Sequence, residues 1–230
     1  MNIQILKRTS LHEGGFAGLR EYRLVQGPEL FGPASNLDGS WPGLGNFVYL
    51  ADARFMPHGE TYMHAHYEVD IISVLVNGRI LHYGTMGNGA FLVHNTVQIQ
   101  RAGGEGLLHN ETNPDGKWNR MIQIWVLPEE EGLAADYKVY KPMQGMVTKV
   151  YGGENDQHTD FPAKTQVNVA RLKTGQSLEV ETPFMAYVTN GMGTANNIQV
   201  ENGDLIRGDS LQFEALSASE IILINTGYQR

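Results

Sequence analysis

Short runs of alternating polar and apolar residues recur along the whole chain and constrain its fold more than any other feature. Clear examples lie at residues 46–54, 71–83 and 120–127, each bounded by Gly, Asn, Asp or Pro. Alternation with a period of two is typical of strands, and segments with a helical period are scarce. Asn77-Gly78 predicts a type I′ hairpin, and the glycines of residues 86–89 predict a second tight turn. The chain is therefore expected to be mostly β, with antiparallel sheets.

The stretch most typical of a helix is a short one at residues 128–136. Pro128 suits a first-turn position, and the acidic residues after it suit the positive end of a helix dipole. Residues 1–11 alternate and lack the apolar core of a signal peptide, so they predict a strand. No run of ~20 apolar residues is present. We therefore expect a cytoplasmic protein without a membrane partner.

Composition excludes several classes of chemistry. The 230 residues include no cysteine, so disulfides, thiolate metal sites and thiol nucleophiles are absent, and any metal must be held by His, Asp or Glu. Seventeen Lys and Arg stand against 25 Asp and Glu, a net charge of -8. This sign disfavours binding to phosphate backbones, so no direct nucleic acid partner is expected.

The two halves of the chain show a faint internal repeat. Four segments of the first half resemble four of the second in the same order: 53–55 and 170–172, 76–78 and 188–191, 97–101 and 204–207, 121–125 and 221–225. An ordered series of this kind favours a duplicated β-barrel. We expect residues 1–135 to form an N-terminal domain and residues 136–230 a C-terminal one.

Two pairs of potential metal ligands stand out in the first half. His64 and His66 are two residues apart, so on a strand they point to the same face with Cβ atoms ~7 Å apart. His109 and Glu111 repeat this spacing, 45 residues after the first pair. One His-x-His pair is equally compatible with a polar strand face. Two pairs on opposed strands would supply four ligands and leave coordination positions open, which suits Fe(II), Mn, Ni, Co, Cu or Zn better than Mg or Ca.

Other polar residues near these pairs are compatible with several roles. Glu68 and Asp70 could ligate the metal, bind an imidazole N–H, or be solvated at the rim. Arg101 could attract an anion or form a salt bridge. Trp118 and Trp125 are expected in the core or at its rim, given the area that Trp buries. The remaining histidines of the first half, His12, His58, His82 and His94, are interpreted as surface or strand residues without a role.

The second half lacks these ligands. Aligning Arg101 with Arg207 puts Ala215 opposite His109 and Ser217 opposite Glu111. Val180 and Thr182 then fall opposite His64 and His66. The one histidine of this half, His158, lies in a polar linker at residues 152–160. The C-terminal domain is therefore expected to be metal-free and structural.

These residues resemble a known superfamily. The block from Gly59 to Gly78 is similar to the first cupin motif, with His-x-His, an acid four residues later and then a glycine; residues 106–113 are similar to the second motif. The Gly-x-x-His-x-Glu spacing resembles the pirin family in particular, and this resemblance covers nearly the whole chain. It implies two tandem cupin β-barrels of the jelly-roll type with few short helices.

The resemblance also implies a site and an activity. It assigns metal-ligand roles to His64, His66, His109 and Glu111, with one Fe(II) ion and with Ni, Co, Mn, Cu or Zn as alternatives. Some pirins open the flavonol quercetin with dioxygen, and others act as nuclear transcriptional cofactors. Family members usually read His-Pro-His-Arg-Gly-Phe-Glu where this chain has residues 64–70, and Asp-Ser-x-Gly where it has residues 84–87. The first difference falls at the mouth of the pocket, where it would alter specificity.

Three functions follow as hypotheses. The first is a quercetin 2,3-dioxygenase-like oxidoreductase acting on an aromatic enol, with Glu111 both as ligand and as the catalytic group that accepts the substrate proton. The second is a non-catalytic, metal-dependent regulatory protein with a protein partner. The third is a cupin sugar isomerase, which requires basic residues beside the metal, and few lie near the motifs.

Overall fold

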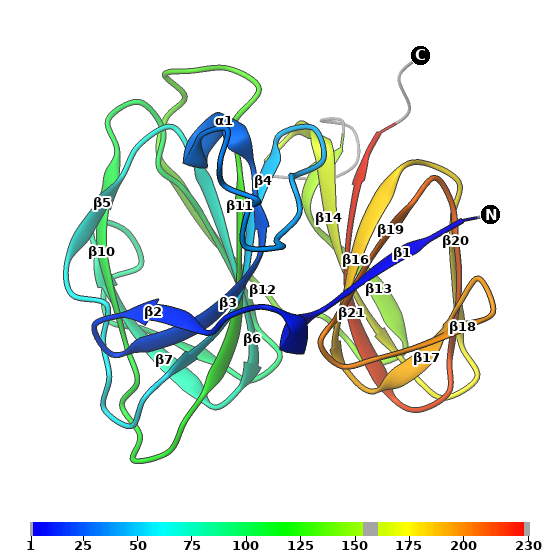
Figure 1. Ribbon diagram of the computed structural model, residues 1–230. Helices are drawn as coiled ribbons and strands as arrows, with labels where there is room; N and C mark the ends of the chain where they lie inside the picture. Colours follow the sequence, from blue (N-terminus) through cyan, green and yellow to red (C-terminus); the bar gives the residue numbers. More distant parts are fainter. Residues whose placement is uncertain (1, 154–160, 228–230) are drawn as a thin grey trace. The chain divides into compact units, whose positions relative to one another are not determined.

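The computed structural model describes residues 2–153 and 161–227, which form almost only strands (Figure 1). The chain divides into two compact units, one of residues Leu11–Lys141 and one that combines Met1–Ser10 with Pro142–Arg230. Each unit contains two antiparallel sheets of the jelly-roll type that face each other without closing into one barrel. The mostly β fold predicted from the alternation is confirmed.

The unit of residues 11–141 has a seven-stranded sheet in the order β12-β9-β6-β11-β4-β3-β2 and a four-stranded sheet in the order β5-β10-β7-β8. One short helix, α1 (Pro28–Phe31), lies between β3 and β4. The strands are β2 (Gly14–Phe16), β3 (Leu19–Gln26), β4 (Phe47–Phe55), β5 (His64–His66), β6 (Asp70–Asn77), β7 (Arg79–Gly84), β8 (Ala90–Val93), β9 (Val97–Arg101), β10 (Leu107–Thr112), β11 (Arg120–Val126) and β12 (Asp136–Tyr140).

The second unit has a six-stranded sheet in the order β1-β19-β16-β21-β14-β13 and a four-stranded sheet in the order β15-β20-β17-β18. A 3-10 turn, η1 (Arg8–Ser10), follows its first strand. The strands are β1 (Gln4–Lys7), β13 (Met146–Gly153), β14 (Ala163–Leu172), β15 (Ser177–Val180), β16 (Phe184–Asn190), β17 (Met192–Ala195), β18 (Ile198–Glu201), β19 (Asp204–Gly208), β20 (Leu211–Ala215) and β21 (Ser219–Thr226).

The strand order repeats between the units. Strands β9, β6, β11, β4 and β3 follow one another in one large sheet as β19, β16, β21, β14 and β13 do in the other, and the four-stranded sheets correspond strand for strand. The cross-strand registers repeat as well, since Met121 pairs with Ala53 and Ile221 with Ala170. These are the residues that the sequence repeat aligned.

The units do not follow the expected division between residues 135 and 136. Strand β12 pairs along its whole length with β9, which keeps residues 136–140 in the first unit. Strand β1 pairs with β19, from Gln4 opposite Arg207 to Lys7 opposite Asp204, so the start of the chain completes the second unit. The difference arises because edge strands join a sheet through backbone hydrogen bonds, which residue patterns along the chain do not reveal.

One predicted turn was wrong and one was confirmed. Asn77-Gly78 does not make a hairpin: β6 belongs to the seven-stranded sheet and β7 to the four-stranded sheet, so the chain passes between sheets there. Gly78 has φ +77°, and a Cβ at this position would come within 2.8 Å of the Cβ of Asn119. The turn at residues 86–89 does join two paired strands, β7 and β8, with positive φ at Gly87 and Gly89.

The helix predicted at residues 128–136 is also wrong. Residues 129–132 form bends and a turn, and β12 begins at Asp136. Gly132 has φ +73° and donates its backbone N–H to Glu68 Oε1 at 2.9 Å, while Gly104 donates to the carbonyl of Leu133. Tertiary hydrogen bonds thus replace the helical ones.

The strand expected in residues 1–11 is present as β1. Among the described residues no helix has the length and apolar character needed to cross a membrane.

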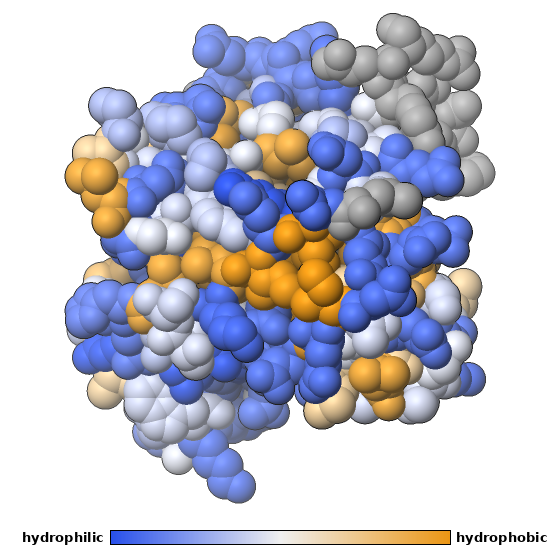
Figure 2. All heavy atoms as spheres, turned by 45° about the vertical axis from the view of Figure 1, so that its right-hand side comes forward, coloured by the Kyte–Doolittle hydropathy of each residue, from blue (hydrophilic) through white to orange (hydrophobic). Residues whose placement is uncertain are grey.

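The interiors of the two units differ. Among the described residues of the first unit, one cluster of buried apolar residues forms around Phe55 and Met121 and another around Ile71 and Leu107. In the second unit a larger cluster includes Ala170, Phe213 and Leu223 and draws on both sheets. On the surface, Figure 2 shows a hydrophobic band crossing one face between hydrophilic areas.

A buried ion pair fixes the end of β6 against β9. Asp70 and Arg101 are directly opposite in register, and the guanidinium donates to both carboxylate oxygens, with Nε to Oδ1 at 2.9 Å and Nη2 to Oδ2 at 2.8 Å. The Asp70 side chain is fully buried and that of Arg101 is 10% exposed. Of the roles considered for these two residues, the salt bridge is the one observed.

Replacing Arg101 with Met should lower the free energy of unfolding by about 3–5 kcal/mol, because Asp70 would stay buried without its cation. The control is Arg79→Met, which removes an ion pair with Asp115 whose side chains are 48% and 36% exposed. Its effect should stay within about 1 kcal/mol. Urea titration followed by tryptophan fluorescence measures both, since all three tryptophans lie in residues 11–141. Equal losses would contradict the prediction.

Candidate metal centre

The pairing of β5 with β10 brings three histidines together. His64 lies directly opposite His109, and His66 lies opposite Leu107. Because residues two apart on a strand share a face, all three imidazoles point to the inside of the unit. Their ring centroids are 4.4–5.0 Å apart. Each ring offers a nitrogen within 4.8 Å of those of the other two.

Hydrogen bonds orient two of these rings. His64 Nδ1 lies 2.8 Å from the carbonyl oxygen of Tyr62, so Nδ1 carries the proton and Nε2 keeps a lone pair. His64 Nε2 lies 2.9 Å from His109 Nε2. On the other side of the His109 ring, Gln100 Nε2 donates to Nδ1 at 3.2 Å. Tyr62 and Gln100 are therefore the residues that hold the two imidazoles in place, and the sequence alone did not reveal them.

Glu111 approaches the cluster beside a fourth histidine. It pairs in register with His82 on β7, and both side chains are buried. Potential ligand atoms of His82, His109 and Glu111 lie within 4.8 Å of one another, so His109 belongs both to this group and to the group with His64 and His66. The structure thus brings the three predicted histidines together and sets Glu111 next to His109. His82, interpreted from the sequence as without a role, lies at the site.

The position of His82 could have been noticed in the sequence. It follows Ile80 by two residues on an alternating strand, so both point inward. His82 Nε2 donates to the carbonyl of Met86 at 2.9 Å, and its Nδ1 has no hydrogen-bond partner among the described residues. By contrast, His12, His58 and His94 are exposed, as expected.

Burial sets the protonation of the site. It lowers the pKa of His66 from 6.5 to about 4, and the nearby His64 lowers it further. Burial also lowers the pKa of His109, to about 2, with added contributions from the other three histidines. In the same interior, burial raises the pKa of Glu111 from 4.5 to about 7. At neutral pH His66 and His109 are therefore neutral with a free lone pair, and Glu111 is near its titration midpoint.

The donor set fits a transition metal. His66 Nε2 and Glu111 Oε1 are buried and have no hydrogen-bond partner in the part of the chain that the structure describes. Leaving such groups unpaired costs free energy, and a cation would satisfy both. Imidazole nitrogens with one carboxylate suit a divalent transition metal rather than Mg or Ca. Glu68, by contrast, binds Gly132, and Asp70 binds Arg101.

A wall of aromatic rings adjoins the histidines. The rings of Tyr49 and Trp125 are 4.4 Å apart, and Phe31 of α1 lies against both at 5.4 and 6.1 Å. Trp125 also contacts the edge of His66, with centroids 5.3 Å apart. The indole Nε1–H of Trp125 is buried without a hydrogen-bond partner among the described residues. Trp125 thus lies at the rim of the core, as predicted, and next to the metal centre.

Tyr49 connects this wall to a buried acid. Its hydroxyl donates to Glu21 Oε2 at 3.0 Å, and Glu21 Oε1 accepts from Arg23 Nε at 2.7 Å. Glu21 and Tyr49 are both buried. The hydrogen bond and the ion pair fix the tilt of the Tyr49 ring against Trp125.

Apolar residues occupy the corresponding positions of the second unit. Glu111 pairs with His82, four residues after Gly78, and Phe213 pairs with Ala195, four residues after Gly191. Phe213 therefore corresponds to Glu111, and Leu211, two residues earlier, corresponds to His109.

The predicted alignment was four residues off at this strand. It placed Ala215 and Ser217 opposite His109 and Glu111. The error arises because the connection from β19 to β20 is shorter than that from β9 to β10. Val180 pairs with Leu211 as His64 pairs with His109, so Val180 was aligned as the structure has it. His158 lies outside the described residues. Leu211 and Phe213, which the alignment did not place opposite His109 and Glu111, have apolar side chains without metal-ligating atoms.

Comparisons with known proteins agree with this geometry. The pirin family model matches residues 44–126, which include all the residues of the metal centre. A Pseudomonas aeruginosa protein that bears the provisional name quercetin 2,3-dioxygenase is 29% identical over 70% of this chain and 75% of its own length. The quercetin 2,3-dioxygenase of Escherichia coli is 24% identical over 70% of this chain and 74% of its own.

Solved structures share the fold over the whole chain. The bacterial pirin YhhW of Escherichia coli, crystallised in complex with nickel(II), superposes with a TM-score of 0.83 at 18% identity, covering 99% of this chain and 100% of that one. The match of residues 44–126 to the pirin family model and the likeness to these relatives make the chain similar to pirins over the unit that holds the histidines.

Proposed function

We propose that this chain binds one divalent transition metal through His64, His66, His109 and Glu111 and uses it to oxidise an aromatic enol of the flavonol class with dioxygen. The observation that carries the proposal is the convergence of three imidazoles beside a buried carboxyl group with unpaired ligand atoms. The relatives named as quercetin 2,3-dioxygenases support the choice of substrate. The nickel-bound pirin supports a metal at this position, and Fe(II) remains our first choice for the resident ion.

When bound, the metal supplies Lewis-acid and redox chemistry, lowering the pKa of an enol that coordinates to it and activating dioxygen. The proton of the enol must then be accepted by a protein group. Glu111 is the buried carboxyl group that lies beside His109, and in the metal-free protein burial raises its pKa to about 7, so this interior favours its protonated form. A water-accessible carboxylate would bind the proton too weakly.

The aromatic wall would orient the substrate. A flavonol is planar, and the Trp125 ring, against which the Tyr49 ring lies tilted by 31°, offers an apolar surface directly beside His66. The unpaired Nε1–H of Trp125 can donate to an oxygen of the bound ring system. Gln100 acts as a positioning residue. For His109 to ligate through Nε2, its proton must lie on Nδ1, so the Gln100 carboxamide, whose Nε2 faces Nδ1 in the metal-free protein, must turn to present its oxygen as the acceptor.

Replacing His66 and His109 together with Ala should abolish stoichiometric metal, because two of the four ligands are lost. The measurement is metal content after chelation and reloading with Fe(II), Ni(II), Co(II) or Mn(II). The matched control is His58→Ala with His94→Ala, which removes two exposed histidines of the same unit. Metal retained at the wild-type level in the first variant would place the site elsewhere.

In the metal-free protein, Glu111→Gln should change how stability depends on pH. As pH rises from about 4.5 to about 7, the carboxyl group ionises in the unfolded state but keeps its proton in the folded state, so the wild type loses stability relative to the variant. Above pH 7 the difference in stability between the wild type and the variant no longer changes with pH. Urea midpoints measured from pH 4 to 8 with EDTA test this, with the exposed Glu105→Gln as control. A pH-independent difference would contradict the raised pKa.

The metal-loaded protein should consume quercetin and dioxygen together, as followed by flavonol absorbance and an oxygen electrode. Glu111→Gln should lower kcat by about 100-fold or more, a typical contribution of a general base. Trp125→Leu should mainly raise KM, because it removes the stacking surface. Stoichiometric metal with no turnover for any of Fe, Ni, Co, Mn and Cu would overturn the enzymatic proposal and favour the non-catalytic regulatory role.

A further inference from the structure

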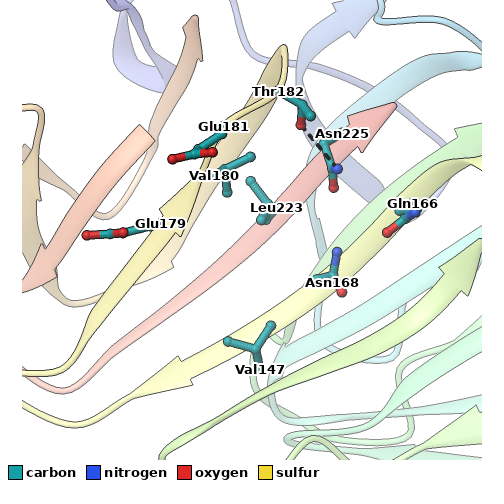
Figure 3. Close-up of a pocket in the computed structure, with 9 residues that line it drawn as sticks. All are labelled: Val147, Gln166, Asn168, Glu179, Val180, Glu181, Thr182, Leu223 and Asn225. Carbon is teal, nitrogen blue, oxygen red and sulfur yellow. Dashed lines mark hydrogen bonds between the residues drawn. The ribbon is translucent and has the colours of Figure 1, made fainter. Parts of the chain in front are cut away.

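The second unit contains a cavity of about 420 Å³ that the metal centre does not use. Nine residues line it, all from β13, β14, β15, β21 and the two residues after β15 (Figure 3). One of its lining residues, Leu223, also belongs to the apolar cluster of this unit. Its size is in the range of sites for small organic molecules.

This cavity occupies the same place in its unit as the metal pocket does in the other. Gln166 pairs with Asn225 across β14 and β21, as Tyr49 pairs with Trp125 across β4 and β11. Two carboxamides thus replace the two stacked aromatic rings. Similarly, Val180 corresponds to His64 through its pairing with Leu211, and Thr182, two residues later, corresponds to His66. The shorter side chains leave open the space that the aromatic rings fill in the first unit.

The polar groups of the cavity are available for a ligand. Gln166 and Asn168 are half-buried, and their carboxamides have no hydrogen-bond partner among the described residues. Asn225 Nδ2 makes one long hydrogen bond to Thr182 Oγ1, at 3.4 Å. A carboxamide offers two N–H donors and one carbonyl acceptor side by side. Three of them on two adjacent strands form a surface complementary to a ligand with neighbouring donors and acceptors.

The interior of the cavity is uncharged. Glu179 and Glu181 are the only charged residues that line it, and Figure 3 shows their carboxylates on the side of β15 away from Val180 and Leu223. Alternation along the strand accounts for this, because Val180 lies between them and points inward. Val180 and Leu223, with Val147, supply apolar contacts. The lining contains no histidine, so it does not suit a transition metal.

We propose that the second unit carries a small-molecule site of its own, which takes an uncharged ring compound with a cis-amide edge, such as a lactam or cyclic imide. Gln166, Asn168 and Asn225 would pair with the N–H and C=O groups of that edge, since a carboxamide can form two parallel hydrogen bonds with a neighbouring donor and acceptor. Val147, Val180 and Leu223 would contact the ring. The site is independent of the metal and of the proposed oxygenase activity.

Titration with uracil, a small uncharged ring with cis-amide edges, tests the proposal. The full chain, loaded with diamagnetic Zn(II) and labelled with ¹⁵N, should show saturable shifts of the side-chain NH₂ signals of Gln166, Asn168 and Asn225. Single variants that lack each group assign these signals. 1,3-Dimethyluracil, which lacks the N–H donors, and orotate, which adds a carboxylate, should each bind about tenfold more weakly or not at all.

The variant Gln166→Met with Asn168→Leu keeps the side-chain volume but removes the polar groups. It should weaken uracil binding by about tenfold or more. The control Gln199→Met removes an exposed carboxamide of β18 and should bind as the wild type does. Metal content and the NMR signals of the first unit should be unchanged in both variants. Equal uracil affinity in wild type and double variant, shifts outside these residues, or equal binding of 1,3-dimethyluracil would overturn the proposal.

Discussion

The antiparallel pairing of β5 with β10 is the contact on which the metal centre depends. It sets His64 opposite His109 and carries His66 and Glu111 into the same interior. With β10 fixed by its pairing to β7, a slip of β5 by one residue would turn His64 and His66 to the outer face. The register is held from both sides, because β10 also pairs with β7, and the Glu111 backbone N–H donates to Thr61 Oγ1.

Burying these polar groups has a cost that the apolar core must offset. Among the described residues, two smaller clusters of buried apolar side chains form in the first unit and a larger one forms in the second. Leu211 and Phe213 occupy the positions of His109 and Glu111 and belong to that larger cluster. Two units of like strand order thus differ at their centres: the first has buried ligand atoms without hydrogen-bond partners among the described residues, and the second has apolar side chains at the corresponding positions. The carboxamide cavity lies in the second unit.

The protonation of the metal centre follows from the same burial. Desolvation disfavours the charged form of any group, so it lowers the pKa of His66 and His109 and raises that of Glu111. Both shifts favour the neutral forms in the metal-free site. A divalent cation would favour the neutral imidazoles and the ionised carboxylate together, so metal binding would release the proton of Glu111.

Several features of this protein could be predicted from the sequence because they depend on local pattern. Alternation gave the strands at residues 47–55 and 120–126, and i, i+2 spacing gave the shared face of His64 and His66. The absence of cysteine limited the ligands to His, Asp and Glu. The second half of the chain has no His, Asp or Glu at the positions that the sequence aligned with His64, His66, His109 and Glu111. These signals lie within a few residues of one another, so they can be read without knowing how strands pair.

The features that the sequence did not predict depend on contacts between distant segments. Asn77-Gly78 has the composition of a hairpin, yet the chain changes sheets there, because β6 pairs with β9 and β11 instead. Residues 128–136 contain helix signals, but Glu68 binds the backbone of Gly132 in a turn. His82 enters the site because β7 pairs with β10, and the carboxamide cavity forms because Gln166 pairs with Asn225. Sequence spacing determined which side chains share a strand face, whereas strand pairing across tens of residues determined which faces meet, since backbone hydrogen bonds between strands carry no residue-specific signal.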